Sequence, residues 1–190
     1  MTLLSANEIF YLVILTAALG YIFSGFIQKP RSPYEIYKNK MFDWENIKFA
    51  AIVSAPAVIL HEFGHKFVAM AFGLQATFHI WPTGLGLGII LRAINAPFLI
   101  LAPAYVSIPA GVTALQGFLI SFAGPFTNLI LWISSALFIK YGKLARNVLL
   151  LFILSAQINK ILFIFNMLPF PPLDGYKVFT NLFTLLSVVF

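Results

Sequence analysis

The residues best suited to chemistry in this chain are His61, Glu62 and His65, which form the segment HEFGH. Two histidines four positions apart lie on the same face of a helix, so both imidazoles can bind one metal ion. Glu62 points in a neighbouring direction, where its carboxylate can take a proton from water held by that metal. The segment therefore predicts a metal centre that activates water, with Glu62 as the catalytic base.

The setting of this segment supports the same interpretation. It lies inside a long apolar stretch, where an ionisable residue is costly to desolvate and is therefore functional by default. The alternative is a helix whose polar residues line a bundle without a metal, but ordinary packing does not compensate for burying two histidines and a glutamate. The chain has no cysteine, so any metal must be held by His, Asp or Glu.

A catalytic zinc site usually has three protein ligands, so the two histidines need one more. The remaining histidine is His79, and Asp174 is the one acid in the chain after Glu62. Asp174 follows three prolines at 169–172, which must break a helix, so it is compatible with a ligand or with a helix N-cap. His79 is compatible with a ligand or with a strand residue at the membrane interface beside Trp81.

The composition indicates which elements must position these residues. Hydrophobic residues make up 61% of the 190 residues and charged residues only 9%, whereas charged residues are about 25% of ordinary globular chains. Long stretches must lie in lipid, where the backbone has to bond internally and therefore forms helices. The net charge of +6 comes from basic residues beside apolar runs, which is typical of membrane flanks rather than of a nucleic-acid-binding face. We therefore expect an all-α polytopic membrane protein.

Four apolar stretches reach the length of about 20 residues that spans a bilayer. The predicted transmembrane helices are residues 9–27, 48–72, 116–139 and 147–168. The first is predicted to be a retained helix rather than a signal peptide, because Glu8 lies where a basic region would be expected. Gly73 is the expected C′ residue of the second. Residues 28–47 are expected to form a polar loop.

Residues 74–115 are apolar but are interrupted by prolines and glycines. We expect a β or loop segment that re-enters the membrane, with strands at 77–81 and 89–91. Residues 176–190 are apolar but too short for a full span, which indicates either a half-helix or a truncated chain.

The order of the predicted spans brings the polar segments together. Because successive spans alternate in direction, 48–72 ends, 116–139 begins and 147–168 ends at the same face of the membrane. HEFGH, the segment GPFTN at 124–128 and Asp174 therefore converge toward one face, as a single buried site requires.

HEFGH, GPFTN and NMLPFPPLDG, in this order on successive spans, resemble the site-2 protease family of intramembrane zinc metalloproteases. The resemblance extends over about residues 48–180. It implies one zinc ion per chain, held by His61, His65 and Asp174. The implied activity is that of a zinc-dependent intramembrane endopeptidase, which hydrolyses a peptide bond within or near transmembrane segments by glutamate-assisted attack of zinc-bound water.

The resemblance also assigns further roles. Glu62 is the implied catalytic base, and Asn128 and Asn166 are implied to assist the substrate or an intermediate. The expected partners are transmembrane protein substrates and the lipid bilayer, without nucleic acid, and no pattern in the sequence indicates an oligomeric state. The segment after HEFGH resembles the re-entrant β element of the family, whose edge is thought to receive the unwound substrate.

The expected organisation is a single membrane-embedded protease domain over 1–190. It comprises the first helix and polar loop (1–47), the catalytic core (48–180) and a C-terminal end (181–190). The chain resembles a minimal core of the family, without a PDZ or regulatory domain, and we expect a prokaryotic plasma membrane. The positive-inside rule predicts that the site faces outward, whereas the resemblance implies that it lies nearer the cytosol.

Two other functions are compatible with polar residues inside a membrane. A metal transporter would have ligands spaced along a path and usually repeated halves, and the sequence has one cluster and no repeat. An inactive scaffold would bind membrane helices without cleaving them. Glu62→Gln separates these hypotheses, because it should abolish proteolysis and spare helix binding.

Overall fold

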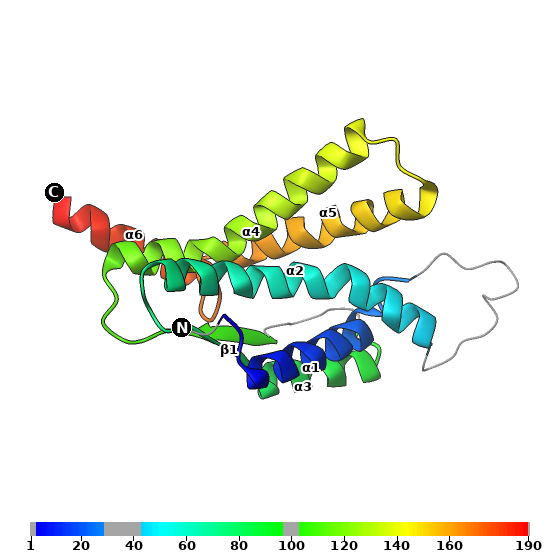
Figure 1. Cartoon of the computed structure of the whole chain (residues 1–190), viewed down its shortest axis with the longest axis horizontal. Coiled ribbons are helices and arrows are strands. Elements are labelled where there is room, and N and C mark those ends of the chain that lie inside the picture. Colours follow the sequence, from blue (N-terminus) through cyan, green and yellow to red (C-terminus); the bar gives the residue numbers. More distant parts are fainter. Residues whose placement is uncertain (1–2, 29–42, 97–102, 190) are drawn as a thin grey trace, which may run out of the picture. The chain divides into compact units, whose positions relative to one another are not determined.

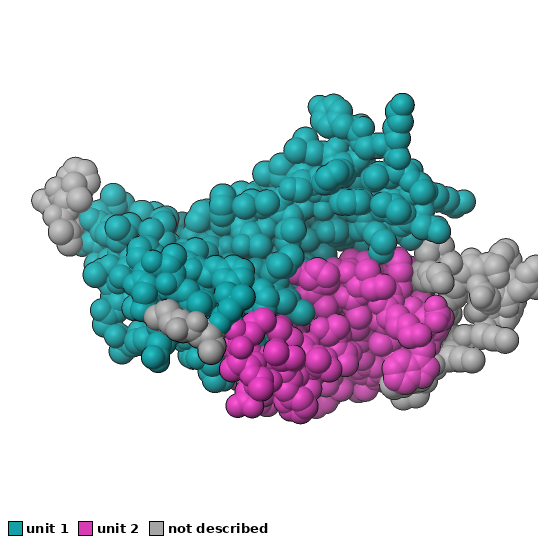
Figure 2. All heavy atoms as spheres, in the orientation of Figure 1, with its two compact units in different colours: residues 1–3, 57–79, 105–190 teal, residues 4–56, 80–104 magenta. Residues whose placement is uncertain are grey.

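The computed structural model describes residues 3–28, 43–96 and 103–189. Along the chain the elements are α1 (Ala6–Phe23), α2 (Trp44–Ala71), β1 (Thr77–Ile80), α3 (Pro82–Ala93), β2 (Ala104–Ser107), α4 (Ala114–Tyr141), α5 (Arg146–Asn166) and α6 (Asp174–Val189) (Figure 1). They group into two compact units, which are coloured separately in Figure 2. Unit 1 comprises residues 1–3, 57–79 and 105–190, and unit 2 comprises residues 4–56 and 80–104.

The predicted fold class is confirmed. Helices α1, α2, α4 and α5 are each long and apolar enough to cross a membrane, and they match the four predicted spans to within a few residues. α6 has 16 residues and is not among these candidate spans. The only sheet in the described part of the chain has two strands.

The polar loop predicted at 28–47 lies mostly outside the described residues. Its last part belongs instead to α2, which begins at Trp44 rather than near residue 48. Asp43 explains the earlier start, because its Oδ1 accepts hydrogen bonds from the backbone N–H groups of Glu45 (3.1 Å) and Asn46 (3.3 Å). A short acceptor side chain in this position is a typical helix N-cap.

Local sequence signals also account for other helix ends. Ser5 with Glu8, and Thr113 with Gln116, form capping boxes at the starts of α1 and α4. Gly73 follows α2 with a φ of 73°, as expected for a C′ glycine. These ends are decided within a few residues of sequence.

The segment after α2 is only partly as predicted. β1 confirms the first strand, but the strand predicted at 89–91 is wrong, because these residues lie in α3. Pro82 occupies the first turn of α3, where its fixed φ favours a helix. Gly84, Leu85, Gly88 and Leu91 are the buried residues of α3, and their helical spacing outweighs the β-type composition of three consecutive residues. The partner of β1 is β2.

Close packing in unit 1 positions the second half of α2. A Cβ atom on Gly64 would lie 2.7 Å from the backbone oxygen of Ala123, so the α2 backbone approaches α4 more closely than a side chain allows. α4 also packs against α5, with which it forms an antiparallel pair, and against α6 (Figure 1). The part of α2 that carries HEFGH therefore contacts α4, and His61 and His65 also contact Asp174 of α6.

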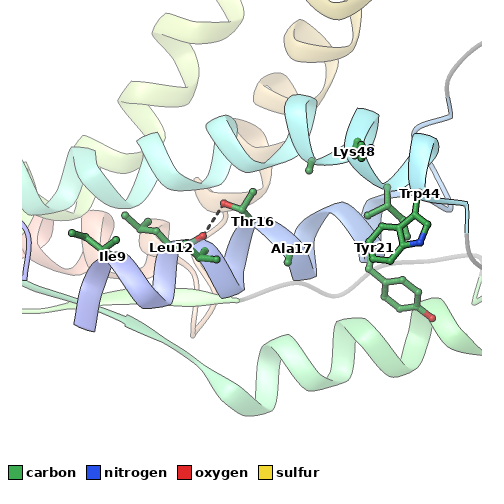
Figure 3. Close-up of a pocket in the computed structure, with 10 residues that line it drawn as sticks. Ile9, Leu12, Thr16, Ala17, Tyr21, Trp44 and Lys48 are labelled. Carbon is green, nitrogen blue, oxygen red and sulfur yellow. Dashed lines mark hydrogen bonds between the residues drawn. The ribbon is translucent and has the colours of Figure 1, made fainter. Parts of the chain in front are cut away.

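Unit 2 contains an apolar groove of about 660 Å³ between α1 and the first part of α2 (Figure 3). Its lining residues are Ile9, Leu12, Val13, Thr16, Ala17, Tyr21, Trp44, Ile47, Lys48 and Ala51. The hydroxyl of Thr16 already donates to the Leu12 carbonyl at 2.7 Å. The groove therefore offers mainly hydrocarbon contacts, and none of the residues predicted to do chemistry lines it.

Candidate metal centre

Three potential ligand atoms from two helices meet in unit 1. His61 and His65 lie on α2, and Asp174 is the first residue of α6. The two Nε2 atoms are 3.2 Å apart, and Asp174 Oδ2 lies 3.0 Å from Nε2 of His61 and 3.2 Å from Nε2 of His65. Among the described residues, these three form the group able to hold a metal ion.

These separations fit a zinc ion. Zinc binds imidazole nitrogen and carboxylate oxygen at about 2.0–2.1 Å in tetrahedral geometry, so neighbouring ligand atoms should be about 3.3–3.4 Å apart. The observed 3.0–3.2 Å is within a few tenths of an ångström of that edge length.

The outer nitrogens of both rings have oxygen partners. Nδ1 of His61 donates to Asn128 Oδ1 at 2.6 Å, and Nδ1 of His65 donates to the backbone oxygen of Ile120 at 2.7 Å. With the proton on Nδ1, each neutral ring presents an Nε2 lone pair to its neighbours. Two such lone pairs and a carboxylate oxygen then face one another, which is an arrangement suited to binding a cation. Metal-binding histidines typically show this pattern of outer hydrogen bonds.

Gly124 of α4 makes room for the two imidazoles. A Cβ atom at this position would collide with Nε2 of His65 and would lie 2.7 Å from Nε2 of His61. A residue with any side chain would therefore occupy the space beside the ligand atoms. The glycine of GPFTN is needed because α4 passes directly beside the metal centre.

The centre is more open on the side of Asp174. The side chains of His61 and His65 are 8% and 9% exposed, whereas that of Asp174 is 20% exposed. With three protein ligands, this open side would allow water or a carbonyl to reach a fourth coordination position, as catalytic zinc sites require.

Glu62 is buried near the same cluster. Glu62 follows His61 on α2, and the residue is 7% exposed. Its role as the catalytic base therefore stays a prediction from the HEFGH segment.

The other predicted site residues have different surroundings. Asn128 lies in the site, bonded to His61. Asn166 is the last residue of α5 and, in the described part of the chain, forms no hydrogen bond with the cluster. His79, the alternative third ligand, lies in β1 and stacks on Tyr105 with ring centroids 5.5 Å apart.

One residue near the centre was not predicted. Asn159 of α5 is 1% exposed, and its Oδ1 accepts a hydrogen bond from Asn128 Nδ2 at 2.8 Å. The available signal was an amide side chain in the middle of an apolar span, where polar groups usually contact other helices. The sequence does not show which neighbour Asn159 contacts.

Comparison with known proteins gives the family. No family model and no solved structure matches the chain. The chain is 31% identical over 174 residues to "Putative zinc metalloprotease MJ0611" of Methanocaldococcus jannaschii, covering 92% of this chain and 84% of that protein. It is 39% identical over 77 residues to "Putative zinc metalloprotease YwhC" of Bacillus subtilis, covering 36% of this chain and 35% of that protein. The similarity to the first relative over most of both sequences shows that this chain belongs to its zinc metalloprotease family.

Proposed function

We propose that this chain is an intramembrane endopeptidase of the site-2 type, which uses one zinc ion to hydrolyse peptide bonds within or near transmembrane segments. The observation that carries the proposal is the position of the ligand cluster. His61 and His65 lie within α2, which is long and apolar enough to span a membrane, and α4 beside them has the same property. A metal centre on such helices is suited to substrates that are themselves in the membrane. The proposed membrane is the plasma membrane of a prokaryotic cell.

The roles of the residues follow from their positions. His61, His65 and Asp174 hold the zinc ion, which when bound lowers the pKa of water and polarises a carbonyl group. Glu62 accepts the proton of the attacking water and transfers it to the leaving amine.

The two asparagines contribute in different ways. Both amide hydrogens of Asn128 are already bonded, to Ala57 O at 3.0 Å and to Asn159 Oδ1 at 2.8 Å, so this residue acts by holding His61. The Asn166 side chain has no such bonds among the described residues and is available to contact the substrate or an intermediate.

The proposed substrates are transmembrane segments of other proteins. A substrate helix must unwind locally before attack, because its backbone carbonyls are bonded internally. We propose that the unwound segment pairs with the sheet formed by β1 and β2, which would satisfy its freed backbone groups.

The test uses purified protein in detergent or liposomes. A reporter with one transmembrane segment is incubated with the wild type, with Glu62→Gln and with Glu45→Gln. Glu45 lies on the same helix but is exposed and pairs with Lys48, so its substitution is the matched control. We expect cleavage by the wild type and Glu45→Gln, loss of cleavage in Glu62→Gln, and zinc binding in all three proteins.

The cleavage position tests the intramembrane assignment. Mass spectrometry of the products should locate the cut within or next to the transmembrane segment, and a soluble, unfolded protein should be a poor substrate. If only the soluble protein is cleaved, the assignment as a metalloprotease stands and the proposed intramembrane activity is refuted.

A further inference from the structure

A chain of hydrogen bonds connects the metal ligand His61 to α5. Asn128 of α4 accepts from His61 Nδ1 at 2.6 Å, and its own Nδ2 donates to Asn159 Oδ1 at 2.8 Å. Nδ2 of Asn159 in turn donates to the Ser155 backbone oxygen at 2.8 Å. Asn128 is 0% exposed and Asn159 is 1% exposed, so water cannot replace these bonds. These hydrogen bonds connect three helices, α2, α4 and α5, that are distant in sequence.

The orientation of each amide in this chain is determined by a backbone carbonyl, which can only accept a hydrogen bond. The Ser155 carbonyl requires the NH₂ group of Asn159, which turns Oδ1 of Asn159 toward Asn128. The Ala57 carbonyl requires the NH₂ group of Asn128 at 3.0 Å, which turns its Oδ1 toward His61. Each bond therefore has one possible direction.

The series of hydrogen bonds ends at the ring of His61 and determines its tautomer. An oxygen of Asn128 facing the ring can accept only from a protonated Nδ1. The lone pair then lies on Nε2, 3.0 Å from Asp174 Oδ2 and 3.2 Å from Nε2 of His65. If Asn128 were reversed, its NH₂ group would favour a lone pair on Nδ1 and a proton on Nε2, which would block metal binding there.

We infer that Asn159 is a positioning residue of the metal centre, which acts through Asn128 to hold His61 in the tautomer and orientation that bind zinc. This inference rests on the proposed zinc site. Asn128 is buried and has two amide hydrogens. The Ala57 carbonyl accepts one of them, so the second needs the Oδ1 atom of Asn159 as its acceptor. Without the Asn159 oxygen, Asn128 must leave one donor unpaired or rotate away from His61.

The test measures zinc affinity by competition with a chromophoric chelator. Partners of metal-binding histidines typically change metal affinity about 10–100-fold, so Asn159→Leu, which removes the acceptor at similar size, should weaken zinc binding about tenfold. Asn159→Asp, as the neutral acid that this buried position favours, keeps an oxygen for Asn128 and a donor for the Ser155 carbonyl, so it should bind zinc within about threefold of the wild type. Ile158→Ala is the packing control, because Ile158 is the adjacent buried residue of α5 and should leave the affinity unchanged.

A second readout separates positioning from packing. In zinc-loaded protein labelled with ¹⁵N-histidine, the Nδ1–H proton of His61 should shift upfield in Asn159→Leu, because its hydrogen bond to Asn128 weakens. The Nδ1–H proton of His65 is the internal reference, since it donates to the Ile120 carbonyl and not to this chain.

The possible outcomes are distinct. Weaker binding in Asn159→Leu alone, with a shift of the His61 signal alone, supports the inference. Wild-type affinity in Asn159→Leu, or equal weakening in Asn159→Asp and Ile158→Ala, overturns it and leaves the zinc site standing. A wild type that binds no zinc overturns the proposed function itself.

Discussion

Gly124→Ala tests the metal centre most directly, because it should favour the helix but weaken zinc binding. In a helix interior, replacing glycine by alanine ordinarily stabilises a protein by about 0.5–1 kcal/mol. At position 124 the new Cβ atom would collide with Nε2 of His65 and would lie 2.7 Å from Nε2 of His61. We therefore expect loss of zinc binding despite the favourable change in helix propensity.

The magnitude follows from the size of the collision. Because ordinary carbon–carbon contacts begin at about 3.5 Å, His61 Nε2 must move by roughly 0.8 Å from its 2.7 Å separation, and His65 must move further. Metal–ligand distances tolerate changes of only about 0.2 Å. The displacement is about four times this tolerance, so the zinc affinity should fall at least about a hundredfold, beyond the range of outer hydrogen-bond partners.

The assay combines zinc affinity with resistance to denaturation in detergent. Gly86→Ala in α3 is the matched control, because a Cβ atom at Gly86 would meet no atom within 4 Å. The control should keep wild-type zinc affinity and unfold at equal or higher denaturant concentration. Wild-type zinc affinity in Gly124→Ala would refute the arrangement of α4 beside the two histidines.

The remaining predictions concern the ligands themselves. Asp174→Asn replaces a charged ligand by a neutral amide and should weaken zinc binding at least about a hundredfold; unchanged affinity in equilibrium dialysis would argue for another third ligand. His79→Ala should leave one zinc per chain, because His79 stacks on Tyr105 instead of joining the cluster, and loss of the metal would contradict this. Zinc affinity should fall as pH decreases, because the imidazole and carboxylate ligands must be deprotonated to bind the metal. A zinc affinity that does not change with pH in competition with a chelator would argue against histidine ligands.

Much of the fold was predictable because it depends on short-range properties. The lengths of α1, α2, α4 and α5 follow from runs of apolar side chains, since a helix is the structure that satisfies its own backbone in lipid. The HEFGH segment places His61 and His65 on one face by helical periodicity alone. Gly73 ends α2 because glycine readily adopts a positive φ.

The strand predicted at 89–91 shows where local composition misleads. Ile89, Ile90 and Leu91 favour a strand as a triplet, but the helix that starts at Pro82 includes them. The actual partner of β1 is β2, formed by residues 104–107, whose pairing depends on a contact across more than twenty residues. Strand pairing at such a separation is not encoded in the composition of either strand.

The sequence by itself determined the spans and the pair of histidines, because apolar length and helical period are properties of a single segment. The family resemblance already implied Asp174 rather than His79, but only the tertiary structure brings Asp174 to those histidines, since it is 109 residues beyond His65 and reaches it through the packing of separate helices. The same holds for Asn159, whose bond to Asn128 joins α5 to α4. Hydrogen bonds between distant helices depend on how closely the helix backbones approach each other. Gly64 and Gly124 allow such a close approach, but which helix they face is decided only by the packing of the folded protein.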